Sequence, residues 1–492
     1  MKANGWLVPE MFSVCLDLRV QLWNFHDEDI EKPSFSFAGH RANIMTVAFS
    51  ASNRYIYSGA ADDMIIRYDM TMPTNSLENH KLYTHHNDMI RGLAPHIFNE
   101  EIFMSASDDG KIMLHDDRTK PSMTRAQGTL QQNAEITDIK SHPLTESLFA
   151  TSDSTGRVCL RDIRMAFGPL AQRANEGVVR TVCGLFKLYR QSQFKYKQYN
   201  TKLSKNGVGH LSNPETSSIN FDRNGSKLAV TMLHFLPTIY SVSDPHPIAV
   251  CSAPLPIPSE QDFIPKERGY TNSCTMKHGS FGGPGLAVDS YYATGSDDFR
   301  AYVWKIPDPA KLLDGRQVFS ADAWAAEASH HIGFTEGLFS PRYVPVDISQ
   351  PAFRLNGHNS IVNTALIHPS FMHIVTAGVE RDIFLHGPAP SSPCTSGLGK
   401  TDTNVRNILP MDPEDRERVF RALSAALGQD SDDTDELETI ALFDQILRQE
   451  GDPDVFDTRH WRPPEGRSDS DAESDPEMAF EQEASSSEDY ME

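Results

Sequence analysis

Residues Gly39–Asp69 read GHRANIMTVAFSASNRYIYSGAADDMIIRYD and hold all the parts of a short β-unit. Apolar and β-branched residues alternate with other residues in two stretches, and an Asp-Asp turn precedes a third stretch that ends in Tyr-Asp. Alternation with a period of two is typical of half-buried strands, and the turn residues separate one strand from the next. The segment therefore predicts an antiparallel sheet built from neighbouring strands.

The same unit recurs along the chain. An aspartate stands six residues before the last aromatic or histidine of a unit in the pairs Asp17–Trp23, Asp62–Tyr68, Asp109–His115 and Asp298–Trp304. The first four end positions, Trp23, Tyr68, His115 and Arg161, are 45, 47 and 46 residues apart. A period of about 40–45 residues is that of one blade of a β-propeller.

We count seven units between residues 5 and 387, so the predicted fold class is all-β, a seven-bladed propeller. Two insertions break the period, near 165–217 and 311–351, and the second reads as a surface loop. The first blade is predicted to be incomplete. Gly5–Val8 and Leu18–Trp23 supply its second and third strands, no first strand precedes them, and Pro9–Leu16 interrupts the turn. Either this blade is truncated or the deduced sequence is faulty there, and the same question applies to the insertion at 173–210.

Each blade of this kind has room for a buried hydrogen-bonded chain. A histidine before the blade, a serine or threonine on the second strand, an aspartate in the next turn and an aromatic on the third strand would satisfy one another, as buried polar groups must. We therefore assign a structural role, and no catalytic one, to His40, Ser58, Asp62, Tyr68, Asp109, Asp298, Trp304 and His358.

The composition changes after Gly387. Residues 388–412 form a linker rich in Pro, Ser and Gly, 413–451 are predicted to hold two short amphipathic helices, and 452–492 are predicted to be a disordered, acidic, serine-rich tail. Residues 401–492 contain 27 acidic side chains against 8 arginines and no lysine, so the net charge of −22 comes mainly from this end.

Several function classes lack their motifs. The six cysteines are scattered, no apolar run reaches the length of a membrane helix, and the first residues do not read as a signal peptide, which predicts an intracellular protein of the nucleus or cytoplasm. No metal, cofactor or nucleophile motif appears, so we expect no catalytic residue, no cofactor and no membrane partner. Lysines and aromatics alternate between Phe186 and Lys205, where nucleic-acid contact is a minor alternative to a solvated loop.

The chain resembles WD40 propellers over about residues 5–387, and more narrowly the cullin-4-associated factor 5 group, also called WD repeat protein 22. Two stretches carry the narrower resemblance: Gly269–Pro307, with GYTNSCTMKHGSF and YYATGSDDFRAYVWKIP, and Leu355–Ile383, with LNGHNSIVNTALIHPSFMHIVTAGVERDI. The resemblance implies a non-enzymatic substrate receptor of a cullin-4 RING ubiquitin ligase, which recruits a protein of unknown identity for ubiquitination.

Such receptors contact the ligase's damage-specific DNA-binding adaptor through a W-D-x-R element at the end of a third strand, often in two consecutive blades. The resemblance places this role on Asp116 with Arg118 and on Asp162 with Arg164, although His115 and Arg161 replace both tryptophans. A guanidinium can bond carboxylates or carbonyls through two nitrogens at once, which suits arginine to the task. The alternatives are a D-x-R that only closes its strand with a local ion pair, and a general WD40 scaffold with no ligase.

Overall fold

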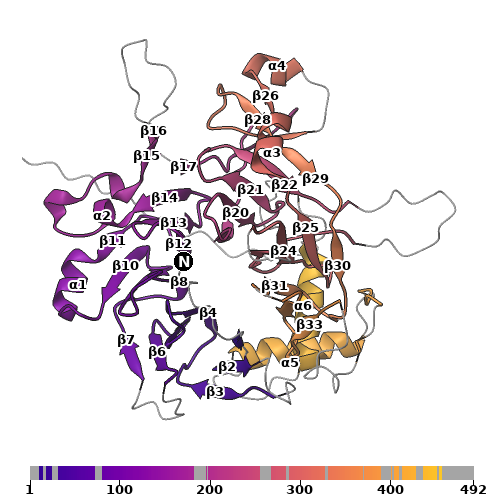
Figure 1. Ribbon diagram of the computed structural model, residues 1–492. Coiled ribbons are helices and arrows are strands. Elements are labelled where there is room, and N and C mark those ends of the chain that lie inside the picture. The colour runs from indigo at the N-terminus through magenta and orange to yellow at the C-terminus, as the bar shows by residue number, and fades with distance from the viewer. Residues whose placement is uncertain are drawn as a thin grey trace, which may run out of the picture. The chain divides into compact units, whose positions relative to one another are not determined.

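The computed structural model describes residues 10–14, 18–24, 32–71, 80–181, 195–196, 198–254, 268–283, 288–326, 331–369, 371–388, 400–401, 404–408, 413–427, 436–450 and 454–456. The described residues form nine sheets, and seven of these, mainly antiparallel, make up the repeating series that we number 1 to 7 (Figure 1). The predicted all-β fold class is confirmed.

Sheets 1 to 4 fill the first part of the chain. Sheet 1 contains β1 (Glu10–Val14), β2 (Arg19–Asn24) and β3 (Phe35–Ala38). Sheet 2 contains β4 (Ile44–Phe49), β5 (Tyr55–Ala60), β6 (Ile65–Asp69) and β7 (Lys81–Tyr83). Sheet 3 contains β8 (Ile90–Pro95), β9 (Ile102–Ser107), β10 (Lys111–Asp116) and β11 (Thr129–Gln131). Sheet 4 contains β12 (Ile136–Ser141), β13 (Leu148–Asp153), β14 (Val158–Asp162) and β17 (Gln198–Tyr199).

Sheets 5 to 7 continue the series. Sheet 5 contains β19 (Thr216–Phe221), β20 (Lys227–Met232), β21 (Thr238–Ser241) and β22 (Pro247–Cys251), extended by the parallel strand β29 (Val346–Ile348). Sheet 6 contains β23 (Ser280–Gly282), β24 (Tyr291–Gly295), β25 (Ala301–Lys305) and β30 (Phe353–Leu355). Sheet 7 contains β31 (Val362–Ile367), β32 (Ile374–Gly378) and β33 (Phe384–His386).

Neighbouring sheets pack through their first strands. β4 contacts β8, β8 contacts β12, β12 contacts β19, and β23 contacts β31. Figure 1 shows β4, β8 and β12 close together, with β7 and β11 farther out. Between sheets 2 and 3, Tyr57 and Phe103 are buried, with ring centroids 4.4 Å apart. Burial of each such ring contributes about 1.5–3 kcal/mol, so apolar contacts between sheets hold successive units together.

The approach of neighbouring sheets leaves no space for a side chain at some inner positions. A Cβ atom added to Gly59, on β5, would lie 2.5 Å from a side-chain carbon of Ile90 on β8. Gly59 is therefore required by packing between sheets 2 and 3, because a side chain at this position would force the two sheets apart.

One expectation for the first blade is wrong. The segment Pro9–Leu16, expected to interrupt a turn, contains β1, and all five residues of β1 pair with β2 from Glu10↔Asn24 to Val14↔Val20. Gly5–Val8, expected to be the second strand, lies outside the described residues. Pairing across a short connection brings β1 into register, and a proline immediately before a strand removes no ladder hydrogen bond.

The expectation that Lys311–Pro351 forms a surface loop is also wrong. This stretch contains β26 (Gln317–Phe319), α4 (Ala321–Ala326), β27 (Ile332–Phe334) and β28 (Arg342–Val344), after α3 (Pro309–Gly315). These strands form one sheet with β18 (Leu203–Lys205), a strand from the other insertion. Trp324 and Phe334 are buried there. Each insertion lacks the pairing partner that the other supplies, so neither has a strand signature by itself.

The remaining elements are short turns and hairpins near sheet 4 and two helices near the end of the chain. They are α1 (Pro121–Gln127), α2 (Ile163–Ala166), the 3-10 turns η2 (Leu170–Gln172) and η3 (Asn175–Gly177), the hairpin β15 (Arg180–Thr181) and β16 (Lys195–Tyr196), α5 (Pro413–Leu427) and α6 (Glu436–Glu450). None of the described helices is both long and apolar enough to cross a membrane.

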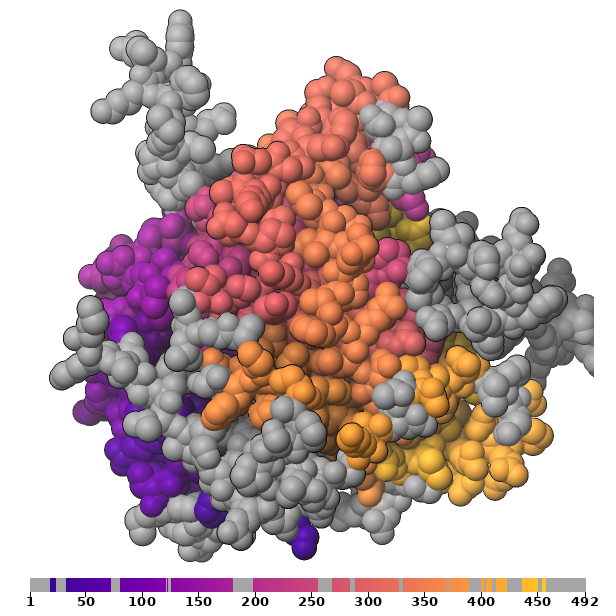
Figure 2. All heavy atoms as spheres, turned by 45° about the vertical axis from the view of Figure 1, so that its right-hand side comes forward, coloured from indigo at the N-terminus to yellow at the C-terminus, as the bar shows by residue number. Residues whose placement is uncertain are grey.

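The α6 helix packs on the loops of sheets 6 and 7. Phe443 and Leu447 contact the apolar cluster of Phe299, Ile361 and Val379. Arg406 donates to both carboxylate oxygens of Asp444, at 2.7 and 2.8 Å. Figure 2 shows the yellow atoms of the two helices beside the orange atoms of the sheet 7 region. The α6 helix therefore covers the edge of sheets 6 and 7 at which their second strands end.

Candidate functional site

The first predicted adaptor element closes the third strand of sheet 3. Asp116 ends β10, and its Oδ1 accepts a hydrogen bond from the backbone N–H of Arg118 at 3.0 Å. The guanidinium of Arg118 also donates to this carboxylate, from Nε to Oδ1 at 2.8 Å and from Nη2 to Oδ2 at 2.7 Å. The Arg118 side chain is 56% exposed. The turn thus holds the planar guanidinium in one orientation at the surface.

The second element has the same geometry in sheet 4. Asp162 ends β14, and its Oδ1 accepts from the backbone N–H of Arg164 at 2.9 Å. Arg164 donates from Nε to Oδ1 at 3.0 Å and from Nη2 to Oδ2 at 2.7 Å, and its side chain is 77% exposed. Asp162 is also the N-cap of α2, so the helix begins at this turn.

Both elements flank one hollow between sheets 3 and 4. Its lining includes Leu114, two residues before Asp116, and Ile163, which lies between Asp162 and Arg164. The structure therefore brings the two predicted elements to the same side of neighbouring sheets. In each element Nε and Nη2 are engaged by the carboxylate, and within the described residues Nη1 makes no hydrogen bond. That nitrogen is free to donate to a carbonyl or carboxylate outside the chain.

Sheet 2 provides an internal reference for this turn. Asp69 ends β6, and its Oδ1 accepts from the backbone N–H of Thr71 at 2.9 Å and from the Thr71 hydroxyl at 2.6 Å. The same backbone turn therefore forms where threonine stands in place of arginine. The aspartate closes the strand in all three sheets, and an arginine two residues later, bonded to that aspartate through Nε and Nη2, is what sheets 3 and 4 add.

Ion pairing affects the titration of both aspartates. The pKa of Asp116 is lowered, chiefly by the hydrogen bond from the Arg118 side chain. Burial acts on Asp162 in the opposite direction, but the hydrogen bonds from Arg164 outweigh it and its pKa is also lowered. Both carboxylates are therefore ionised at neutral pH and keep their arginines charged and oriented.

The same edge of sheets 3 and 4 presents two apolar side chains that the sequence analysis did not single out. His96 Nδ1 accepts from the backbone N–H groups of Phe98 and Asn99, both at 3.1 Å. His142 Nδ1 does the same for Leu144 and Thr145, at 3.3 and 3.0 Å. Phe98 and Leu144 are each 63% exposed. A His-x-apolar pattern after a first strand was the available signal in the sequence.

The residues given a structural role in sheets 2, 3 and 7 form hydrogen-bonded chains. His40 Nε2 lies 2.6 Å from Ser58 Oγ, His40 Nδ1 lies 3.1 Å from Asp62, and Ser58 Oγ lies 3.3 Å from the Tyr68 hydroxyl. In sheet 3 the members are His86, Asp109, Ser105 and His115, and in sheet 7 they are His358, Glu380, Thr376 and His386. Burial lowers the pKa of His40 in spite of Asp62, and it lowers that of His386 to about 4.

In sheet 6, Asp298 and Trp304 do not meet in such a chain. Asp298 accepts from the Tyr302 hydroxyl at 2.5 Å, and burial raises its pKa. The Trp304 indole donates instead to the backbone oxygen of Ser252 at 2.8 Å. Lys277 pairs with Asp297 in the interior at 2.5 Å, with both side chains fully buried. The aspartate and the tryptophan keep their places in the sequence repeat while their hydrogen-bond partners differ.

Sheet 4 has the largest departure from the pattern. Arg161 occupies the end position of the third strand and is 2% exposed. Its Nε donates to Thr151 Oγ1 at 2.9 Å, Nη1 donates to the backbone oxygen of Glu176, and Nη2 lies 3.3 Å from Gln132 Oε1. Burial lowers the pKa of Arg161. The residue that supplies this acceptor, Glu176, has a left-handed backbone conformation with φ of 56°.

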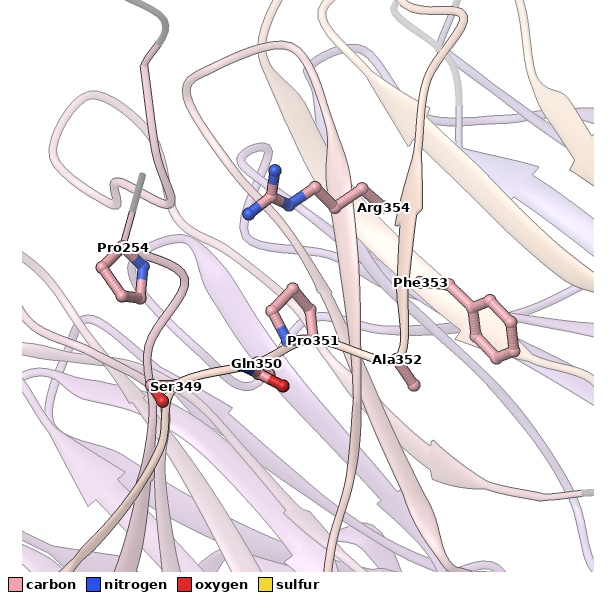
Figure 3. Close-up of a pocket in the computed structure, with 7 residues that line it drawn as sticks. All are labelled: Pro254, Ser349, Gln350, Pro351, Ala352, Phe353 and Arg354. Atoms are coloured by element: carbon pink, nitrogen blue, oxygen red, sulfur yellow. The ribbon is translucent and has the colours of Figure 1, made fainter. Parts of the chain in front are cut away.

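Two observations on the described residues bear on a catalytic interpretation. The open pocket in Figure 3 is lined by Pro254 and Ser349–Arg354, and Arg354 is its one charged side chain. No carboxylate or histidine lines it to act as a base. Within the part of the chain that the structure describes, no group of three or more His, Cys, Asp or Glu residues is arranged to hold a metal ion.

Most of the basic and aromatic stretch lies outside the described residues. Of its aromatic residues, Tyr199 is buried on β17 between Val158 and Tyr240. A buried ring is not available for stacking on a base, so this residue gives no support to nucleic-acid binding.

Comparisons with known proteins agree with this architecture. The family of WD domain, G-beta repeats matches residues 31–69 and 77–116, which include the strands of sheet 2 and the first three strands of sheet 3. The chain is 26% identical over 443 residues to DDB1- and CUL4-associated factor 5 of Mus musculus, and the same identity and length hold for that of Homo sapiens. These matches cover 88% of this chain and 37% of each relative, so the chain spans little more than a third of their length. The chain thus carries WD40 repeats and is similar, over most of its length, to DDB1- and CUL4-associated factor 5.

Proposed function

We propose that this protein is a non-enzymatic substrate receptor of a cullin-4 RING ubiquitin ligase. The names of the two relatives associate them with DDB1 and CUL4, and the alignments cover most of this chain. The observation that supports the proposal best is the repeated element itself: two arginines in neighbouring sheets, each held at the surface by the aspartate two residues earlier.

The ion pairs support docking for a physical reason. Each guanidinium is held at two nitrogens, so less side-chain entropy is lost when the partner binds. The nitrogen that remains free can donate to a main-chain or side-chain oxygen of the adaptor. Phe98 and Leu144 at the same edge add apolar area, which a charged pair alone does not supply. In this proposal the opposite edge receives the protein to be ubiquitinated.

A pull-down of the DDB1-type adaptor tests the proposal. We expect wild type to recover the adaptor, and Arg118→Ala/Arg164→Ala to recover it about tenfold less, because both free donors are lost. The matched control is Arg54→Ala in sheet 2, which removes another exposed arginine, 50% exposed and 3.8 Å from Asp69. This control should bind as wild type does.

The outcomes separate the two functions under consideration. Equal recovery by wild type and the double variant would show that Arg118 and Arg164 are not the docking residues. If neither of them recovers the adaptor, the result would contradict a role in the ligase. It would favour a general WD40 interaction scaffold in a nuclear or cytoplasmic complex.

A further inference from the structure

A three-residue segment near the end of the described chain, Asp454–Phe456, lies in a socket formed by another part of the molecule. The socket consists of β18 and the residues that follow it, through Ser212. Asp454 Oδ2 lies 2.9 Å from Lys205 Nζ. Ser212 Oγ donates to the backbone oxygen of Val455 at 2.7 Å, and His210 Nε2 lies 3.2 Å from that of Phe456. The segment is therefore held by contacts to both its side chains and its main chain.

Phe456 provides the apolar part of the contact. Its side chain is 6% exposed and belongs to the cluster that contains Tyr199, Leu203 and Phe334. The ammonium of Lys205 lies 5.7 Å from the centre of the Phe456 ring, so one lysine contacts both the acidic and the aromatic side chain. Asp454 Oδ1 accepts from the backbone N–H of Phe456 at 3.0 Å, which fixes the spacing of the two side chains.

The socket lies at the edge of the sheets opposite to Arg118 and Arg164. Those arginines follow the third strands β10 and β14, whereas β18 lies in the connection from the last strand of sheet 4 to β19, the first strand of sheet 5. In an antiparallel sheet of four strands, a third strand ends at one edge and a fourth strand ends at the other. A ligand in the socket would therefore leave the D-x-R face open.

We propose that this socket is a binding site for peptide segments of the form Asp-x-Phe from another protein, and that the chain's own Asp454–Phe456 occupies it in cis. The socket binds an acidic and an aromatic side chain that are two positions apart. The hydrogen bonds from the socket to main-chain oxygens could form with a peptide of any sequence. The middle position, Val455, is half-buried, its side chain packs against the same apolar cluster as Phe456, and its backbone oxygen accepts the bond from Ser212. The site therefore suits a peptide with an apolar residue between the aspartate and the phenylalanine.

The contacts also indicate that the cis segment can be exchanged. The side chains of Lys205 and Asp454 are 30% and 48% exposed, so solvent screens their attraction and the pair is weak. A tethered segment competes with an effective concentration of roughly millimolar. A target that is brought close by other contacts can match that concentration and displace it. The proposal that the socket binds peptides does not depend on the proposed function. The further step, that the bound peptide belongs to a ubiquitination target, rests on the proposed function.

Fluorescence anisotropy with a labelled peptide tests the site. The probe is a synthetic peptide with the sequence of residues 450–458, EGDPDVFDT. We expect the full chain with Phe456→Ala to bind the probe at least about tenfold more tightly than wild type, because the tethered competitor no longer fills the socket. Adding Lys205→Glu to that variant should reduce the affinity about tenfold again. A probe with alanine in place of phenylalanine should not bind.

Matched controls keep the test decisive. Phe339→Ala removes a phenylalanine that is 93% exposed elsewhere, and it should bind the probe as weakly as wild type. If Phe456→Ala proves unstable, Asp454→Lys opens the site differently, by placing a like charge beside Lys205 while the ring stays. Failure of both variants to bind more tightly than wild type would overturn the proposal. Adaptor recovery by Phe456→Ala should equal that of wild type, so failure at the socket is distinguishable from failure of the proposed function.

Discussion

Sheets 3 and 4 end in the same surface turn, yet their interiors are built from different side chains. In sheet 3, His115 closes a chain of neutral and acidic groups through Ser105 and His86. In sheet 4, Arg161 takes the place of His115 and is satisfied by Thr151 and by groups of the insertion. The turns at Asp116 and Asp162 nevertheless have the same hydrogen bonds within 0.2 Å.

The difference shows that the turn is local and the interior is not. An aspartate that accepts the N–H two residues later forms a turn by itself, and sheet 2 forms it with Thr71. The buried residue directly before this aspartate, His115 or Arg161, depends instead on the hydrogen-bond partners that the rest of the fold places around it. Stability and docking should therefore respond to different residues although these are close in the sequence.

The largest expected effect tests the interior of sheet 4. Arg161→Leu should lower the free energy of unfolding by about 3 kcal/mol, because three hydrogen bonds to a charged donor are lost and polar groups remain buried without partners. Urea denaturation followed by circular dichroism measures this change. Arg164→Leu, three residues later and exposed, is the control and should leave the midpoint unchanged. Equal effects of the two variants would contradict the division between interior and surface.

The next largest effect is a difference between the interiors of sheets 3 and 4 in how stability depends on pH. Burial lowers the pKa of His115 well below 6.5, so His115 is neutral in the folded protein and takes up a proton on unfolding. Its stabilising contribution is present above about pH 6.5 and is lost as the pH falls from there through the folded-state pKa. His115→Tyr, which places at this position the residue that sheet 2 has as Tyr68, should lose about 1–2 kcal/mol less stability than wild type between pH 7 and pH 5.

Urea midpoints at several pH values give this difference directly, because a constant cost of the larger side chain cancels between them. Arg161→Leu serves as the comparison from sheet 4. Its change in stability with pH should parallel that of wild type, since arginine stays protonated in this range. A His115→Tyr variant as acid-sensitive as wild type would show that His115 already carries a proton in the folded protein.

The smallest effect lies within the turns themselves. Asp162→Ala should lower the free energy of unfolding by about 1 kcal/mol, since Asp162 is the N-cap of α2 as well as the partner of Arg164. Asp116→Ala lacks the helix and should cost less. Thermal melting of the two variants side by side measures the difference. A larger loss for Asp116→Ala would mean that the helix cap contributes nothing in sheet 4.

Much of the candidate face could be predicted from the sequence. Asp116 and Arg118 are two residues apart, as are Asp162 and Arg164, so each turn depends only on near neighbours in the chain. Phe98 and Leu144 were missed, because an exposed apolar residue in a turn has no periodic pattern around it. Their role depends on the histidines that fix the turn and on which edge of the sheet the turn occupies.

Pairing between distant segments was the main source of error. The strands at 317–344 need β18, and the socket for Phe456 needs residues 203–212. No local pattern indicates which of several short apolar stretches will meet, since such contacts depend on loop closure over long separations.

The sequence by itself determined the repeat, its period, the strand alternation and the Asp-x-Arg turns, because each of these depends on residues that are neighbours along the chain. Only the tertiary structure decided which polar groups satisfy Arg161, how the two insertions combine into one sheet, and that Asp454–Phe456 lies against β18. These outcomes depend on burial, and a polar or aromatic group acquires its buried partners only when segments far apart in the sequence are packed together.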